Sequence, residues 1–143
     1  TWKEYDLVQQ TSSVPYRREI HGVFLMKRRI VWRIVIKRGV RRDRVAILMF
    51  NCLEWLPIYF GILKTGAIAV PFNFRFASDE IKYCADLAEV HVLFFGPEFI
   101  GRIEAIEEEL SKGRLLIYVG DGCPTFAESY RELVADCSSQ ASV

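Results

Sequence analysis

The stretch from residue 43 to residue 75 constrains the fold more than any other part of the chain. It opens with an unbroken apolar run of strand length, residues 45–50. Apolar residues then recur at helical spacing over residues 53–64, and Gly66 stands where a helix ends in a left-handed residue. A second apolar run follows at residues 67–70. A strand, a helix and a strand in about thirty residues have the size and order of one βαβ crossover. Because both strands are continuously apolar, they predict a parallel sheet covered on both faces.

The same stretch resembles a known family. From Asp43 the chain reads D-R-V-A-I-L-M-F-N-C-L-E-W, and from Tyr59 it reads Y-F-G-I-L-K-T-G-A-I-A-V-P-F-N-F-R. These residues are similar, without a gap, to the N-terminal subdomain of the AMP-forming acyl-CoA synthetases, which belong to the adenylate-forming superfamily. The ending A-V-P-F-N-F-R resembles the acyl- and aryl-CoA ligase branch. The resemblance implies that residues 1–143 are a partial N-terminal domain of the AMP-dependent synthetase and ligase fold.

Strand and helix patterns continue to alternate after the crossover. Two further apolar runs predict strands at residues 90–95 and 115–119. Three further helices are predicted, over residues 78–87, 97–110 and 126–134. Ser78 is expected to cap the first of them, and Pro97 suits the opening position of the second. This alternation predicts an α/β fold with a parallel sheet.

The ends of the chain are expected to add little to this fold. Residues 1–15 are polar and typical of a poorly ordered lead-in, and residues 137–143 have the composition of a beginning linker. No composition shift divides the rest. The chain has 143 residues, of which 51% are hydrophobic, and this is enough for one domain with a real core.

The segment before the crossover, residues 17–42, departs from the family pattern. Residues 28–37 read R-R-I-V-W-R-I-V-I-K, so propensity favours a strand, whereas the resemblance implies the helix that we expect. Residues 27–44 hold nine Lys and Arg against one acid. Three interpretations stay open. The run is a patch for an anionic membrane surface or nucleic acid, a solvated helix face, or a frame-shifted stretch in a gene remnant.

Cysteine spacing and hydropathy indicate the compartment. Cys52, Cys84, Cys123 and Cys137 are far apart, and the chain has only two histidines, so no metal site is predicted. Free thiols are typical of a reducing compartment. No apolar run approaches the roughly 20 residues of a membrane helix, and no signal segment opens the chain. With a net charge of +1, no nucleic-acid partner is expected. The sequence therefore predicts a cytoplasmic protein without a transmembrane segment.

Five polar residues in or just after the matching stretch are considered for a structural or functional role. Asn51 either shapes a ligand-facing loop at a strand end or, as we favour, caps the following helix. Glu54 is interpreted as an acid of that helix's first turn. Asn73, Arg75 and Glu80 are the best candidates for a role in a larger enzyme. They are expected to fix the loop after the second strand through an Arg–carboxylate contact, or alternatively to face the CoA side of a cleft.

The resemblance implies a reaction for the full-length parent rather than for this chain alone. In the family, a carboxylate reacts with ATP and Mg²⁺, and the acyl group then passes to CoA. A Ser/Thr/Gly-rich loop ending in Lys, a ribose-binding Asp, a magnesium-binding Glu and a lid Lys serve this chemistry, and this sequence contains none of these motifs. Residues 111–114 and 120–124 lack phosphate-loop spacing and are interpreted as turns. We therefore assign no catalytic, cofactor-binding or metal-binding residue and expect the chain alone to be inactive.

The expected partners follow from this interpretation. The first is the remainder of the synthetase fold, and the parent's substrate is a carboxylic acid. A lone subdomain would expose apolar surface, so we also expect self-association. The alternative is a non-catalytic binding module, or a gene remnant, in which the basic segment 27–44 meets an anionic partner.

Overall fold

A computed structural model describes residues 44–110 and 112–139, and this part of the chain contains one sheet of five strands. The strands are β1 (Arg44–Leu48), β2 (Ile68–Pro71), β3 (Val90–Phe95), β4 (Leu115–Tyr118) and β5 (Glu128–Ser129). Their order across the sheet is β2-β1-β3-β4-β5, and every neighbouring pair is parallel. The expected α/β fold with a parallel sheet is confirmed.

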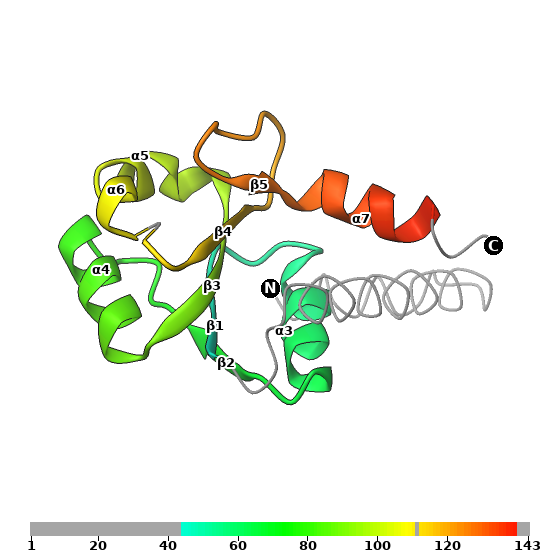
Figure 1. Ribbon diagram of the computed structural model, residues 1–143, viewed down its shortest axis with the longest axis horizontal. Coiled ribbons are helices and arrows are strands. Elements are labelled where there is room, and N and C mark those ends of the chain that lie inside the picture. The colour runs from blue at the N-terminus through cyan, green and yellow to red at the C-terminus, as the bar shows by residue number, and fades with distance from the viewer. Residues whose placement is uncertain (1–43, 111, 140–143) are drawn as a thin grey trace, which may run out of the picture.

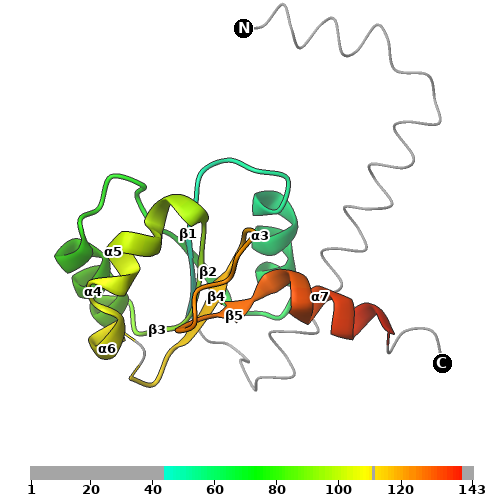
Figure 2. The same ribbon diagram turned by 90° about the horizontal axis from the view of Figure 1, so that it is seen from above.

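Helices cover both faces of this sheet. They are α3 (Trp55–Lys64), α4 (Ser78–Leu87), the short 3-10 helix η1 (Pro97–Phe99), α5 (Ile100–Glu104), α6 (Glu107–Leu110) and α7 (Tyr130–Ser139). Figures 1 and 2 show α3 and α7 on one side of the sheet, with α4, α5 and α6 on the other. The result is a three-layer arrangement with the sheet in the middle.

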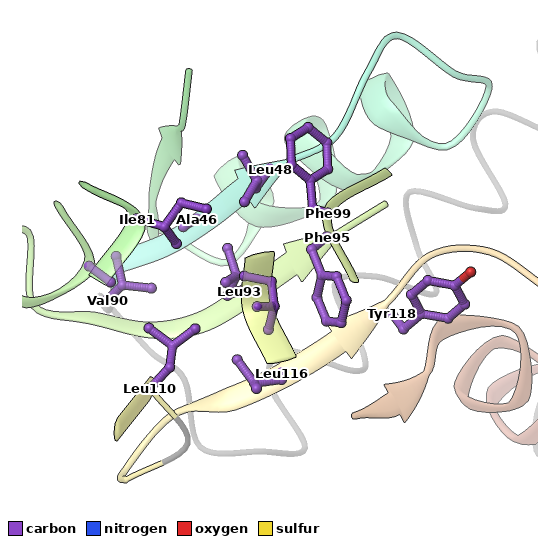
Figure 3. Packing of buried hydrophobic residues seen from close by; sticks show 12 residues of the cluster. Ala46, Leu48, Ile81, Val90, Leu93, Phe95, Phe99, Leu110, Leu116 and Tyr118 are labelled. Atoms are coloured by element: carbon purple, nitrogen blue, oxygen red, sulfur yellow. The ribbon is translucent and has the colours of Figure 1, made fainter. Parts of the chain in front are cut away.

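The three central strands, β1, β3 and β4, are mostly apolar because both faces of each lie in a core. Val45 and Ile47 of β1 belong to the cluster beneath α3 and α7. Ala46 and Leu48 belong to the cluster beneath α4, α5 and α6, part of which Figure 3 shows. Successive side chains of a strand point to opposite faces, so a strand buried on both faces needs an unbroken apolar run.

The crossover forms as expected, with small shifts at its ends. β1 ends at Leu48, and Phe50 is half exposed. The helix begins at Trp55 rather than at residue 53. Gly66 has a φ of +79°, and its N–H donates to the carbonyl oxygen of Leu63 at 3.1 Å. A left-handed glycine therefore ends α3, as the sequence predicted.

Two expectations about helix starts and continuity are wrong. Ala77, not Ser78, occupies the N-cap position of α4, and its N–H donates to Oε2 of Glu80 at 2.8 Å. The Glu80 carboxylate thus satisfies the backbone N–H of the N-cap residue, which is the part that a glutamate at the third helical position takes in a capping box. The single helix predicted over residues 97–110 is divided into η1, α5 and α6. The break follows a tightened turn, in which Ile106 N–H donates to the Ile103 carbonyl at 3.0 Å.

The last predicted helix starts later and extends further than the apolar pattern indicated. Glu128 and Ser129 pair with Ile117 and Tyr118 and form the edge strand β5. The free edge of β4 supplies backbone partners to this pair, and the helix α7 begins only at Tyr130 and runs to Ser139.

Several predictions lie outside the described residues. These are the lead-in 1–15, the helix expected within residues 17–42, all of the basic segment 27–44 except Arg44, and the last four residues of the linker. Within the described residues, no helix is long and apolar enough to cross a membrane. In the same region, Cys52, Cys84 and Cys123 are free thiols, and no group of three or more His, Cys, Asp or Glu side chains is arranged to hold a metal ion.

Candidate functional site

Three parallel strands end at the same edge of the sheet, and a cleft of about 290 Å³ opens there. The segments that follow β1, β3 and β4 and the start of α7 line it, through Met49, Phe50, Asn51, Cys52, Glu54, Gly96, Pro97, Glu98, Val119, Gly120, Asp121, Tyr130 and Arg131. Backbone hydrogen bonds hold these segments in register. The N–H of Gly96 donates to the carbonyl oxygen of Leu48 at 3.0 Å, and the N–H of Val119 donates to the carbonyl oxygen of Phe95 at 2.9 Å. Ligands of open α/β sheets bind beyond such carboxyl ends, so this cleft is the candidate site.

Two glycines let the cleft walls come close together. A Cβ atom at Gly96 would lie 2.9 Å from Oε2 of Glu98 and 3.1 Å from Cβ of Met49. A Cβ atom at Gly120 would lie 2.5 Å from the hydroxyl oxygen of Tyr118. Gly96 directly follows the last residue of β3, and Gly120 follows the last residue of β4 by two positions. The turn predicted over residues 120–124 includes Gly120, whereas the sequence offers no local signal for Gly96.

The charged groups of the cleft make it acidic. Its lining contains Glu54, Glu98 and Asp121 against Arg131 alone, which gives a formal charge of −3 + 1 = −2. Nη1 of Arg131 lies 2.6 Å from Oδ1 of Asp121, so the guanidinium is already engaged by a carboxylate. Both side chains are more than three-quarters exposed, and an exposed pair of this kind contributes little stability. Among the described lining residues, the cleft therefore offers an anionic ligand one cation, Arg131, which stands in an exposed ion pair.

Tyr130 is the buried polar group of the site. Its side chain packs edge-on to Phe94 with ring centroids 6.4 Å apart, and its hydroxyl has no hydrogen-bond partner in the part of the chain that the structure describes. Burial raises the pKa of this hydroxyl, and the nearby Glu54 and Cys52 raise it further. Tyr130 therefore stays protonated and can only act as a neutral hydrogen-bonding group at neutral pH.

Asn51 lies in the cleft wall and does not cap α3. The N-cap position belongs to Glu54, three residues later, whose side chain makes no capping hydrogen bond. The favoured capping interpretation of Asn51 is therefore wrong; Asn51 lines the cleft, and its role toward a ligand stays a prediction. Trp55, which follows Glu54, stacks on Tyr59 with ring centroids 5.3 Å apart and packs as an aromatic of the helix.

Asn73, Arg75 and Glu80 lie outside the cleft. Asn73 Oδ1 accepts the N–H of Arg75 at 3.0 Å, and the Arg75 guanidinium lies over the ring of Phe74. Glu80 caps α4 and, among the described contacts, forms no ion pair with Arg75. The expected Arg–carboxylate contact is therefore absent, although the three residues do have local structural roles.

Arg102 holds the loop after β2 instead. Its Nη1 donates to the carbonyl oxygens of Phe74 at 2.7 Å and Phe76 at 3.1 Å. The same guanidinium lies over the ring of Phe99, 5.3 Å from its centroid. Sequence reasoning missed this residue, since an arginine in a predicted helix gives no signal that its partners are backbone groups.

The two glycine-containing candidates are turns, as expected. Gly113 and Gly122 have φ values of +81° and +70°. Beside the first turn, Arg114 donates through Nε to the Val90 carbonyl at 3.0 Å and through Nη2 to Asp86 Oδ1 at 2.5 Å. The second turn contributes Gly120 and Asp121 to the wall of the cleft. The site thus contains polar groups at strand ends without a phosphate-binding loop among the described residues.

Comparison with known proteins gives one consistent family. A family model described as AMP-binding enzyme matches residues 29–141. The long-chain-fatty-acid–CoA ligase FadD13 of Mycobacterium tuberculosis is 33% identical over 95 residues, which are 66% of this chain and 18% of that protein. A long-chain-fatty-acid–CoA ligase of Thermus thermophilus is 33% identical over 94 residues, 66% of this chain and 17% of the relative. The chain thus spans less than a fifth of the length of these curated relatives.

Solved structures agree with the sequence matches. The crystal structure of the anthranilate CoA ligase AuaEII in complex with anthranoyl-AMP superposes with a TM-score of 0.74 at 27% identity. The superposition covers 79% of this chain and 22% of that protein.

Proposed function

Since this chain belongs to the family of AMP-binding enzymes, we propose that it is the N-terminal portion of an AMP-forming acyl-CoA synthetase. Its parallel α/β fold is that of the N-terminal domain of adenylate-forming enzymes, so the family expected from residues 43–75 is confirmed. In the proposed reaction, a carboxylate oxygen attacks the α-phosphorus of ATP and pyrophosphate leaves. The thiol of CoA then attacks the acyl carbon, and AMP leaves. Mg²⁺ offsets the charge of the phosphates in the parent enzyme.

The charge of the cleft supports the proposal that ATP and Mg²⁺ bind to a part of the parent enzyme outside this chain. The lining carries a formal charge of −2, and Asp121 already engages its one guanidinium, Arg131. An acidic cleft repels the phosphates of ATP. The described residues contain no group of three or more His, Cys, Asp or Glu side chains arranged to hold a metal ion, which supports a Mg²⁺ site outside them. We infer that the remainder of the synthetase fold holds ATP, Mg²⁺ and CoA, and that this chain alone is inactive.

The location, the substrate and the partner of the parent enzyme are part of what we propose. The parent acts in the cytoplasm on a carboxylic acid, and its relatives make a fatty acid and an aromatic acid the candidates to test. The principal partner of this chain is the rest of its own synthetase. The described residues provide the parallel sheet, the strand-end cleft and the loop held by Arg102.

A chimeric enzyme tests the proposed role directly. The matched 95 residues of the Mycobacterium tuberculosis ligase are replaced by the corresponding residues of this chain, and acyl-CoA formation from fatty acids is measured. We expect a cooperative melt and acyl-CoA formation above that of the heat-inactivated chimera. A chimera that folds but forms no acyl-CoA contradicts the proposal.

A separate assay tests the inactivity of the chain alone. The purified 143-residue chain is incubated with ATP, Mg²⁺, labelled pyrophosphate and a panel of fatty and aromatic acids. We expect no exchange of label into ATP above a protein-free blank. Exchange above the blank would contradict the proposed inactivity of the chain alone, and it would not affect the family assignment.

A further inference from the structure

Tyr130 carries a buried hydroxyl at the wall of the strand-end cleft. The residue is only 6% exposed, and it lines the cleft from the start of α7. Its hydroxyl has no hydrogen-bond partner in the part of the chain that the structure describes. Buried polar groups in proteins are almost always hydrogen-bonded, so a buried hydroxyl that lacks a partner beside a cleft points to a ligand there.

Two carboxylates line the same cleft. Burial raises the pKa of Tyr130 most, and the charge of Glu54 raises it further, so the Glu54 carboxylate lies near the hydroxyl. Glu98 comes from η1, and its Oε2 lies 2.9 Å from the position that a Cβ atom of Gly96 would take. The ion pairs between described residues do not include Glu98. The hydroxyl and the two carboxylates thus reach the cleft from three separate segments.

The charge of the lining favours a cation. Its three carboxylates, those of Glu54, Glu98 and Asp121, stand against one guanidinium and give a formal charge of −2. The guanidinium belongs to Arg131, whose Nη1 lies 2.6 Å from Oδ1 of Asp121. A cleft lined by one sign of charge raises the local concentration of ligands of the opposite sign. The ligand that completes the hydrogen bonding of Tyr130 should therefore be positively charged.

We propose that the strand-end cleft binds a primary alkylammonium group, held by Tyr130, Glu54 and Glu98. An ammonium group is compact and has three N–H donors that point in different directions. It therefore suits acceptors that come from different segments, whereas a planar guanidinium suits the two oxygens of one carboxylate. The hydroxyl of Tyr130 accepts one of these N–H groups and donates its own proton to a carboxylate oxygen of the cleft wall.

The apolar part of the lining fits the alkyl stem. Met49 and Val119 are each 8% exposed, Phe50 is half exposed, and the cleft of about 290 Å³ has room for a short chain of methylene groups. Such a stem packs along apolar surface while its charged end meets polar partners. Two sources supply this chemistry, a lysine side chain from the remainder of the parent enzyme and a free primary amine. The site itself does not depend on the proposed ligase reaction.

A titration of the full 143-residue chain tests the proposal. n-Butylammonium is added at constant ionic strength, and nuclear magnetic resonance follows the backbone amides of Gly96 and Gly120, which line the cleft. n-Butanol and butyrate at the same concentrations are the controls for the apolar stem and for the sign of the charge. We expect saturable shifts with the amine alone, and a weaker affinity at higher salt. Equal shifts with n-butanol would reduce the contact to the apolar stem and overturn the proposal.

Three variants locate the bound ammonium group. Tyr130→Phe and Glu98→Gln should each lower the affinity for n-butylammonium several-fold, because each weakens one acceptor. Glu104→Gln is the matched control, since this exposed glutamate lies on α5 outside the cleft lining and its loss should leave the affinity unchanged. A thermal melt shows whether each variant folds, and Glu98→Gln decides alone if Tyr130→Phe does not fold. An affinity equal to that of the parent in both cleft variants would contradict the proposal.

A capped lysine distinguishes the two sources. Nα-acetyl-lysine methylamide carries the same ammonium group with a peptide bond on each side, as in a protein chain. If it binds with an affinity similar to that of n-butylammonium, the site admits a lysine side chain, such as one from the remainder of the parent. If n-butylammonium alone binds, the ligand is a free amine. If neither binds, the cleft is not an ammonium site.

Discussion

Nη1 of Arg102 lies 2.7 Å from the carbonyl oxygen of Phe74, a residue 28 positions earlier in the chain. The same nitrogen lies 3.1 Å from the carbonyl oxygen of Phe76. One guanidinium in α5 therefore fixes the loop that leads from β2 to α4. Charged donors form the stronger hydrogen bonds of proteins, so this contact is the main polar link between the two segments.

Loss of this link should destabilise the protein. Arg102→Ala removes the donor of two carbonyl groups and the cation above Phe99, and we expect a cost of about 1.5–3 kcal/mol in the free energy of unfolding. Arg131→Ala is the matched control, because its ion pair with Asp121 is exposed and contributes about 0–1 kcal/mol. Urea unfolding measures both. Equal effects of the two substitutions would show that the loop does not depend on Arg102.

Removing the unpaired hydroxyl of Tyr130, unlike removing the Arg102 side chain, is not expected to lower the free energy of unfolding. Tyr130→Phe removes a buried hydroxyl that has no partner among the described residues and keeps the ring against Phe94. A buried polar group without a partner costs about 1–3 kcal/mol, so we expect the phenylalanine variant to be as stable as the parent or more stable. Thermal and urea unfolding measure the difference.

Tyr130→Ala separates the ring from the hydroxyl. It removes a buried aromatic side chain, and a loss of about 3–5 kcal/mol is expected. If Tyr130→Phe also lost more than about 1 kcal/mol, the hydroxyl would have to donate to a group outside the described residues.

Close approach at Gly120 makes this glycine a sensitive position. A Cβ atom there would meet the hydroxyl of Tyr118, which is itself held by the carbonyl of Asp121 at 3.0 Å. Gly120→Ala must displace the ring or the cleft wall, and we expect a cost of about 1–3 kcal/mol. Gly101→Ala is the control, because nothing lies within 4 Å of its added Cβ and it sits in α5. There, alanine should stabilise the helix by about 0.5–1 kcal/mol. The same sign for both variants in urea unfolding would contradict the prediction.

The sequence carries the signals for most of the sheet but not for the cleft. β3 matches its run, residues 90–95, which is apolar at every position except the exposed His91, because burial on both faces requires apolar residues at successive positions. β5 leaves no such signal: Glu128 and Ser129 are polar, and the free edge of β4 rather than their side chains makes them a strand. Propensity cannot detect a strand that depends on a neighbour's backbone.

The candidate site is harder to predict for a related reason. The loop that contains Asn51 was recognised as a possible ligand-facing loop, since it follows a parallel strand. Tyr130 was not recognised, because it comes from a helix that starts eighty residues later and reaches the cleft only through the path of β4 and β5. Residues gathered from separate strand ends share no local spacing, so only the topology brings them together.

Asp86 links the stability of the protein to acidic pH. Its Oδ1 accepts a hydrogen bond from Arg114 at 2.5 Å, and its Oδ2 lies 3.3 Å from Nζ of Lys82. The hydrogen bond from Arg114, followed by that from Lys82, lowers the pKa of Asp86 below its ordinary value of 3.8. A carboxyl group whose pKa is lower in the folded state binds protons more readily when unfolded. Its contribution is therefore present above pH 3.8 and is lost as the pH falls through the lower, folded pKa.

Substitution of Asp86 by asparagine should remove this pH-dependent contribution. Asp86→Asn should lower the urea midpoint near neutral pH, and the difference from the parent should shrink as the pH falls below 3.8, where the parent carboxylate becomes protonated. The Arg114→Gln background is the control, because the same substitution there should change the midpoint less if the guanidinium is the main partner. A difference between Asp86→Asn and the parent that stays constant down to the acid limit of folding would mean that the carboxylate gains nothing from Arg114 and Lys82.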